Sequence, residues 1–122
     1  MIEVKEIRKS FDAIEVLNGF FFFFEKGKAS LILGQSGSGK TVFLKNLIGL
    51  LTPTSGQILY EGDNMLEFDY KEKQRLRSEI GVVFQGSALY DTMNIIENVK
   101  FPLQMFSDVS DAEAEIRARE VL

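Results

Sequence analysis

The chain has 122 residues, a formal net charge of −4, and no His, Cys or Trp. The lack of Cys excludes disulfides and thiol nucleophiles within these residues, and the lack of His excludes an imidazole base or ligand. The acidic balance argues against nucleic-acid binding, which needs a basic surface. No apolar run approaches the ~18 residues that cross a bilayer, and the first residues lack the layout of a signal peptide. We therefore expect a cytoplasmic protein with no nucleic-acid partner.

In chain order, the first elements are predicted to be strands. Residues 2–7 alternate apolar and charged side chains, which is typical of a strand with one buried face. Residues 16–24 form a second predicted strand, which ends at a turn over 25–28. The apolar run 29–33 leads into a glycine-rich loop, and such a run fits a strand buried on both faces of a mostly parallel sheet.

The later elements alternate between helix and strand. Apolar residues recur at helical spacing over 41–51, which predicts a largely buried helix. After it we expect a turn near Pro53, a strand over 57–60, a polar helix over 71–78, a buried strand over 81–84, and helices around 93–105 and from 110. Ser110 and Glu113 have the spacing of a capping box, with Ser110 as the N-cap of the last helix.

Five consecutive phenylalanines, Phe20 to Phe24, are the low-complexity feature of the chain. We expect a strand that is buried on both faces; a hydrophobic docking site and an irregularity of this sequence remain alternatives. Because identical neighbours give no in–out alternation, the register of this strand is weakly specified, and the run resembles an aggregation-prone segment.

Residues 34–41 read GQSGSGKT and match the phosphate-binding loop pattern G-x-x-x-x-G-K-[ST]. Gly34, Gly37 and Gly39 let the backbone turn tightly, so that its N–H groups can form an anion-binding nest at the start of the next helix. The alternative is an incidental Gly/Ser-rich turn, which the preceding apolar run and the following amphipathic helix disfavour.

The last residues of the loop carry its chemistry. Lys40 is placed to reach the β- and γ-phosphates of a nucleotide, and the hydroxyl of Thr41 is placed to ligate Mg²⁺. The sequence therefore predicts a site for a nucleoside triphosphate with its metal ion.

The loop and its surroundings resemble the nucleotide-binding domain of ABC transporters over essentially the whole chain. The resemblance rests on IEV at 2–4, SF at 10–11, VLNG at 16–19, EKGK at 25–28, the loop itself, LTPTSGQILYEG at 51–62 and IGVVFQ at 80–85. It implies an α/β fold of P-loop NTPase type, with an N-terminal antiparallel β subdomain, part of the parallel core sheet and the start of the helical subdomain. We expect one incomplete ABC nucleotide-binding domain over 1–122: the β subdomain and P-loop core through the Q-loop at 1–85, and the start of the helical subdomain at 86–122.

The resemblance also assigns roles to residues outside the loop. It places Phe11 where adenine stacks, Val16 near the base, and Gln85 at the Q-loop, which approaches Mg²⁺ and the attacking water. Taken alone, Phe11 would be a core residue, Val16 fits core packing equally well, and Gln85 would be a solvated strand end. The implied cofactors are ATP and Mg²⁺, and the expected nucleotide-binding residues are Phe11, Val16, Gly34, Ser36, Gly37, Ser38, Gly39, Lys40, Thr41 and Val42. Lys40 and Gln85 are the expected catalytic residues, and Thr41 and Gln85 the expected Mg²⁺ ligands.

One position of the loop departs from the family pattern. Many members carry a second Thr after GKT, where this chain has Val42. One hydroxyl contact to the α-phosphate is then missing, which we expect to cost about 1 kcal/mol of nucleotide affinity.

The stretch 86–103 is similar to the Mla-type branch of ABC ATPases, which powers phospholipid trafficking across the bacterial envelope. In this family the region after the Q-loop meets the coupling helix of a membrane permease. We therefore expect a permease subunit as a partner through the region after Gln85, and a position on the inner face of the cell membrane. The alternative is that the apolar residues here simply pack a helical subdomain.

Several elements of the family are missing from these residues. The signature LSGGQ, the Walker B strand with its carboxylates and the switch His do not occur. We expect the N-terminal half of an ABC ATPase that pairs head-to-tail with a second ATPase subunit in its full-length form, and that does not hydrolyse ATP as these residues alone. The alternatives are a soluble ABC ATPase without a permease, and a truncated module that binds nucleotide without hydrolysis.

Overall fold

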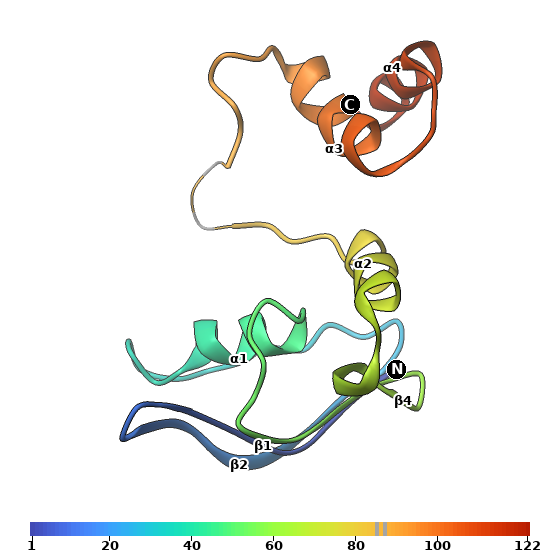
Figure 1. Cartoon of the computed structure of the whole chain (residues 1–122). Helices are drawn as coiled ribbons and strands as arrows, with labels where there is room; N and C mark the ends of the chain where they lie inside the picture. The colour runs from blue at the N-terminus through green and yellow to red at the C-terminus, as the bar shows by residue number, and fades with distance from the viewer. Residues whose placement is uncertain (85, 87) are drawn as a thin grey trace. The chain divides into compact units, whose positions relative to one another are not determined.

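The structure is a computed structural model of the whole chain, and it describes every residue except Gln85 and Ser87. The chain divides into two compact units, Met1–Ile80 and Gly81–Leu122 (Figure 1). The elements of the first unit are β1 (Ile2–Phe11), β2 (Ile14–Phe24), α1 (Lys40–Leu47), β3 (Ser55–Tyr60), β4 (Asp63–Asn64), the short 3-10 helix η1 (Met65–Glu67) and α2 (Tyr70–Ser78). Those of the second are α3 (Ile95–Phe106) and α4 (Asp111–Val121).

The first unit is built on a four-stranded antiparallel sheet with the order β2-β1-β3-β4. Ile2 of β1 lies opposite Phe24 of β2 on one side and opposite Tyr60 of β3 on the other. The predicted antiparallel β subdomain is therefore confirmed, and the strands predicted over 2–7, 16–24 and 57–60 are all present.

The core of this unit lies between the sheet and α1. Phe43 and Leu47 stand one turn apart on α1, so they share the helix face that meets the sheet. They are buried together with residues of three strands and η1: Val4, Ile7, Leu17, Ile58 and Met65. The helix ends earlier than the predicted 41–51, because Gly49 adopts a φ of +71° and the amides of Leu50 and Leu51 return to the Lys45 carbonyl at 2.8 and 3.0 Å.

The phenylalanine run alternates between two faces of β2, so the expectation that both faces are buried is wrong. Phe20, Phe22 and Phe24 are half-buried and pack on the core, whereas Phe21 and Phe23 are 67% and 49% exposed. The pleat of a strand sends successive side chains to opposite faces even when they are identical. In the first unit α1 covers one of these faces.

The predicted parallel core strands are not formed in the described residues. Residues 29–33 and 81–84 carry no strand assignment, and Leu31, Leu33 and Val83 are 79%, 82% and 100% exposed. A parallel strand is buried only where neighbouring strands and covering helices flank it. Among the described residues no strand pairs with either segment.

The second unit is a helix pair with a capping box at the start of each helix. The Asn94 side chain accepts from the Glu97 amide and Glu97 returns to the Asn94 amide; Ser110 and Glu113 do the same for α4. The predicted cap at Ser110 is thereby confirmed. Between the helices, the buried ammonium of Lys100 lies 2.7 Å from Asp111 and 3.7 Å from Glu115.

Candidate functional site

The phosphate-binding loop leads directly into α1, and Gly39 is the residue at the junction. Gly39 is the N-cap of α1 with a φ of +91°, and no side chain caps this end of the helix. A Cβ on Gly39 would stand 3.0 Å from the Val16 carbonyl oxygen and 3.2 Å from Leu17 Cδ2. The left-handed backbone and the close approach of β2 both require glycine here, and they bring the loop against the sheet.

The start of α1 presents backbone donors that the described residues do not satisfy. Phe43 N–H donates to the Gly39 carbonyl at 2.8 Å, whereas the amides of Lys40, Thr41 and Val42 donate to no acceptor within the described residues. The first amides of any helix lack internal partners, and together with the helix dipole they attract an anion. Three amides without acceptors therefore lie at the start of α1, where the sequence predicts the nest.

Lys40 holds its ammonium over the loop. Its Nζ donates to the carbonyl oxygens of Gly34 and Gln35, each at 2.6 Å. The loop itself is closed by a turn in which Ser38 N–H donates to the Gln35 carbonyl at 3.2 Å. A positive charge thus lies on the loop that leads to the free amides, where phosphate oxygens would compete with the two carbonyls for it.

The other predicted loop residues include three exposed hydroxyl side chains and one half-buried apolar side chain. Ser36, Ser38 and Thr41 are exposed, so their hydroxyls are accessible to a ligand. Val42 is half-buried and packs against the core of the first unit. For Mg²⁺, the described residues hold no cluster of three His, Cys, Asp or Glu side chains that would bind a metal ion. The exposed Thr41 hydroxyl fits an ion that takes most of its ligands from phosphate oxygens and water.

Two residues predicted for the adenine side lie on β1 and β2. Val16 is half-buried, and its carbonyl forms the close approach to Gly39 described above. Phe11 is 43% exposed at the end of β1, with the Lys9 ammonium 5.0 Å from its ring centroid. The alternative that Phe11 is a core residue is therefore wrong, and its ring is open to a stacking partner. Gln85, the predicted Q-loop residue, lies outside the described residues.

An aromatic cluster behind the loop was not predicted as part of the site. The ring of Phe43 on α1 lies 4.9 Å from Phe20 in an edge-on arrangement, and 6.5 and 6.4 Å from Phe22 and Phe24. Residues of this cluster and of the loop together line a small pocket of about 230 Å³: Leu17, Phe20, Phe22, Ile32, Leu33, Ser38, Gly39, Lys40 and Phe43. The uniform run Phe20–Phe24 carries no alternation in the sequence, so no local signal pointed to this support.

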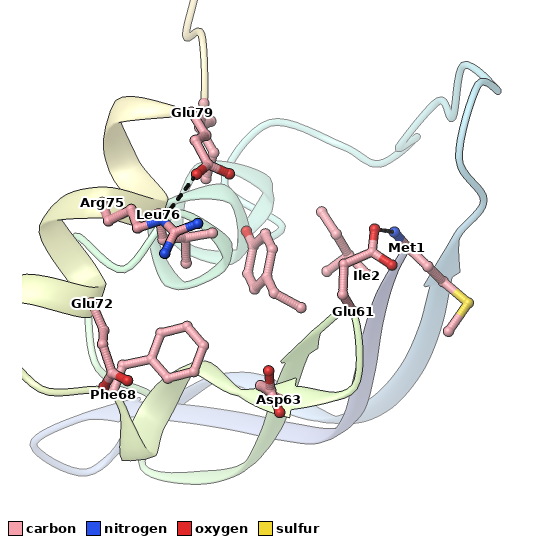
Figure 2. Close-up of a pocket in the computed structure, with 11 residues that line it drawn as sticks. Met1, Ile2, Glu61, Asp63, Phe68, Glu72, Arg75, Leu76 and Glu79 are labelled. Carbon is pink, nitrogen blue, oxygen red and sulfur yellow. Dashed lines mark hydrogen bonds and ion pairs between the residues drawn. The ribbon is translucent and has the colours of Figure 1, made fainter.

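A larger pocket of about 540 Å³ lies in the first unit away from the loop (Figure 2). An ion pair joins the amino terminus to Glu61 at its rim, which lowers the pKa of that carboxyl. Tyr60 donates from its hydroxyl to the Leu47 carbonyl at 2.5 Å, and burial raises the pKa of Tyr60 to about 12. None of the predicted site residues lines this pocket, so the phosphate-binding loop remains the candidate site.

Residues 17–122 match the ABC transporter family, and the chain belongs to this family. It is 42% identical over 116 residues to the probable ribonucleotide transport ATP-binding protein mkl of Mycobacterium leprae, covering 95% of this chain and 33% of that protein. It is 36% identical over 104 residues to the sulfate/thiosulfate import ATP-binding protein CysA of Pseudomonas syringae, covering 85% of this chain and 30% of that protein.

Solved structures agree with this assignment. The dimeric structure of MJ0796, a bacterial ABC transporter cassette, is similar with a TM-score of 0.85 and 30% identity, over 98% of this chain and 55% of that one. The structure of cbiO1 from Clostridium perfringens, part of the ABC transporter complex cbiONQ, has a TM-score of 0.85 and 27% identity, over 99% of this chain and 48% of that one. The chain thus spans about half of these cassettes and a third of the mkl protein, and the predicted P-loop NTPase fold class is confirmed. Within the described residues, no helix combines the length and apolar character that crossing a membrane requires.

Proposed function

We propose that this chain is the nucleotide-binding part of an ABC transporter ATP-binding subunit and holds MgATP at residues 34–41. The observation that carries the proposal is the start of α1, where three successive amides lack acceptors in the described residues, together with the Lys40 ammonium on the carbonyls of Gly34 and Gln35 in the same loop. These groups bind and orient the phosphates. When bound, Mg²⁺ would neutralise charge on the β- and γ-phosphates, and Thr41 and Gln85 are the ligands that we assign to it in this chain.

The adenine end of the nucleotide is assigned to Phe11 and Val16. Phe11 offers an exposed ring, and Val16 lies against Gly39 at the base of the loop. Stacking of the adenine on Phe11 would be stabilised by dispersion, and the nearby Lys9 ammonium adds positive charge at the same ring. In support, one solved relative is described as bound to ADP and Pi, with a TM-score of 0.84 and 29% identity.

Hydrolysis needs more than these residues supply. Positioning of the attacking water and the metal depends on several groups at once, and of these the chain offers Lys40, Thr41 and Gln85. The sequence contains no LSGGQ segment and no His. We infer that these 122 residues bind MgATP but release no phosphate by themselves.

The wider role concerns transport. We assign the chain to a head-to-tail dimer with a second ATPase subunit, and to a permease contacted through the region after Gln85 on the inner face of the cell membrane. The similarity of residues 86–103 to Mla-type ATPases supports phospholipid as the cargo. The two relatives described above carry the names of ribonucleotide and sulfate/thiosulfate transport proteins, so cargo differs within the family.

Titration of the chain with a fluorescent ATP analogue and Mg²⁺ tests the proposal. Because Lys40→Ala removes a charge-assisted hydrogen bond of roughly 1.5–3 kcal/mol, we expect affinity to fall about tenfold to a hundredfold. Lys45→Ala is the matched control, since Lys45 is an exposed lysine on the same helix, and it should leave affinity unchanged. Equal binding by the wild-type chain and Lys40→Ala, with far-UV circular dichroism intact, would contradict the proposal.

A further inference from the structure

The outer edge of β2 is a free strand edge within the part of the chain that the structure describes. β2 is the end strand of the sheet, and its hydrogen-bonded neighbour is β1 alone. No backbone hydrogen bond joins residues 14–24 to any other described segment. The strand is 11 residues long, and from Val16 to Phe24 it carries neither a charge nor a proline. Edge strands normally use such residues to prevent pairing with another chain.

The exposed face of the same strand is apolar. Phe21 and Phe23 are 67% and 49% exposed, and together with Glu3, Val4, Lys5 and Phe22 they line a shallow hollow of about 280 Å³. Both the backbone edge and this face therefore lack a partner in the described residues. Neither is used in the proposed nucleotide site.

We propose that this edge pairs with the same edge of a second copy of the chain, antiparallel and about a two-fold axis at Phe22. In this register Phe22 lies opposite its own copy, and the opposed residues on either side are Phe21 with Phe23 and Phe20 with Phe24, which are the last residues of β2. Residues directly opposite in an antiparallel pair lie on the same face, so the exposed Phe21 packs on the exposed Phe23 of the second copy.

A second copy fits this edge better than an unrelated strand would. Every cross-strand pair within the run is aromatic with aromatic, which stabilises antiparallel strands. The nearest charged residues, Glu25 and Lys26, lie beyond the end of β2, so no charged residues meet within the paired stretch. All five residues of the run are phenylalanine. A shift of the pairing register therefore still places phenylalanine opposite phenylalanine within the run.

The assembly closes at two chains. The opposite edge of the sheet is β4, which has two residues, Asp63 and Asn64. A strand this short, with a charged residue, does not support further pairing. The expected product is a dimer with one continuous sheet, formed without nucleotide.

Analytical ultracentrifugation of the chain without nucleotide, over a range of concentrations, tests this dimer. The wild-type chain should reach twice its 13.8 kDa mass. The double variants Phe21→Lys/Phe23→Lys and Phe21→Glu/Phe23→Glu should each stay monomeric, because like charges then face each other, with a dissociation constant raised at least tenfold. An equimolar mixture of the two should dimerise again, because every opposed pair is then oppositely charged.

Ile14→Lys is the matched control, since Ile14 is also an exposed apolar residue of β2 but lies outside the paired stretch; it should dimerise like the wild type. A wild-type chain that runs at 13.8 kDa at every concentration overturns the proposal, whatever the variants do. So do assemblies larger than two chains, association that requires MgATP, or a mixture of folded variants that stays monomeric.

Discussion

Two segments of the first unit, β3 and residues 29–33, both contain consecutive apolar residues but differ in their backbone pairing. Ile58 of β3 is fully buried, whereas Leu31 and Leu33 are 79% and 82% exposed. β3 pairs with β1 on one side and with β4 on the other, while no described strand pairs with residues 29–33. Apolar composition therefore makes a segment able to form a buried strand, and backbone partners decide whether it does.

The loop between these segments is formed in spite of this difference. The geometry of the loop depends on two contacts with β2 of the antiparallel sheet. Gly39 packs against Val16 and Leu17, and Phe43 packs against Phe20. The phosphate-binding loop is thus supported from the sheet that is present. The following predictions test this comparison, from the largest expected effect to the smallest.

Truncation of a buried and of an exposed apolar residue should give very different results. Ile58→Ala should lower the free energy of unfolding by about 2–5 kcal/mol, because it leaves a cavity in the core. Leu33→Ala should change it by less than about 0.5 kcal/mol, as expected for an exposed side chain. Urea unfolding followed by circular dichroism measures both. Similar losses for the two variants would show that residues 29–33 are buried in solution.

Substitutions at two glycines with a positive φ compare the cost of backbone strain alone with the cost of strain plus a steric clash. Gly27 has a φ of +75° and open space around it, so Gly27→Ala should cost about 1–2 kcal/mol of left-handed strain. Gly56 has a φ of +99°, and a Cβ there would stand 2.5 Å from the Glu6 carbonyl oxygen. Gly56→Ala should cost more, because β1 and β3 must separate at that point. The same urea titrations check the order, and equal costs would contradict the packing of β3 on β1.

The helix pair of the second unit should depend on pH through Lys100 and Asp111. The Lys100 ammonium holds the pKa of Asp111 below its ordinary value of 3.8. The hydrogen bond to Asp111 raises the pKa of Lys100 above 10.5, with Glu115 adding to the effect. Because the pKa of Asp111 is lowered in the folded chain, its ionised form stabilises the helix pair above pH 3.8, and this stabilisation is lost as the pH falls further. Because the pKa of Lys100 is raised, its charged form stabilises the helix pair below pH 10.5, and this stabilisation is lost as the pH rises further.

Far-UV circular dichroism between pH 2 and 7 measures the loss of helix signal at acid pH, which we call the acid limb. Asp111→Asn should weaken the loss of helix signal at acid pH, because the neutral side chain no longer titrates. Arg75 and Glu79 of α2 form an exposed ion pair, and Glu79→Gln is therefore a control that should leave the acid limb unchanged. Identical acid limbs in the wild type and Asp111→Asn would contradict the assignment.

The sequence predicted the elements whose signals are local. Alternation predicted β1, a short apolar run predicted β3, the Ser110–Glu113 spacing predicted the start of α4, and the glycine-rich pattern predicted the loop with Lys40 and Thr41. In each case the residues that specify the element lie within a few positions of one another. The family resemblance then placed Val16, which the structure brings against Gly39.

The errors concern properties that depend on distant partners. The run Phe20–Phe24 was expected to be buried on both faces because its composition is uniform, but which faces are covered depends on α1. Residues 29–33 were expected to be a buried strand because they are apolar, but a strand also needs hydrogen-bonded neighbours. The role of Phe43 behind the loop was missed for the same reason, since its ring partners come from β2.

Hydrogen–deuterium exchange of the chain with and without MgATP tests most directly whether residues 34–41 form a phosphate-binding site. Bound phosphates accept hydrogen bonds from the free amides at the start of α1, so exchange over 34–42 should slow on addition of MgATP. Exchange over β3 should stay the same, and Lys40→Ala should show a much smaller change at the loop. Exchange over 34–42 that is unaffected by saturating MgATP, or slowed equally in Lys40→Ala, would contradict the central claim.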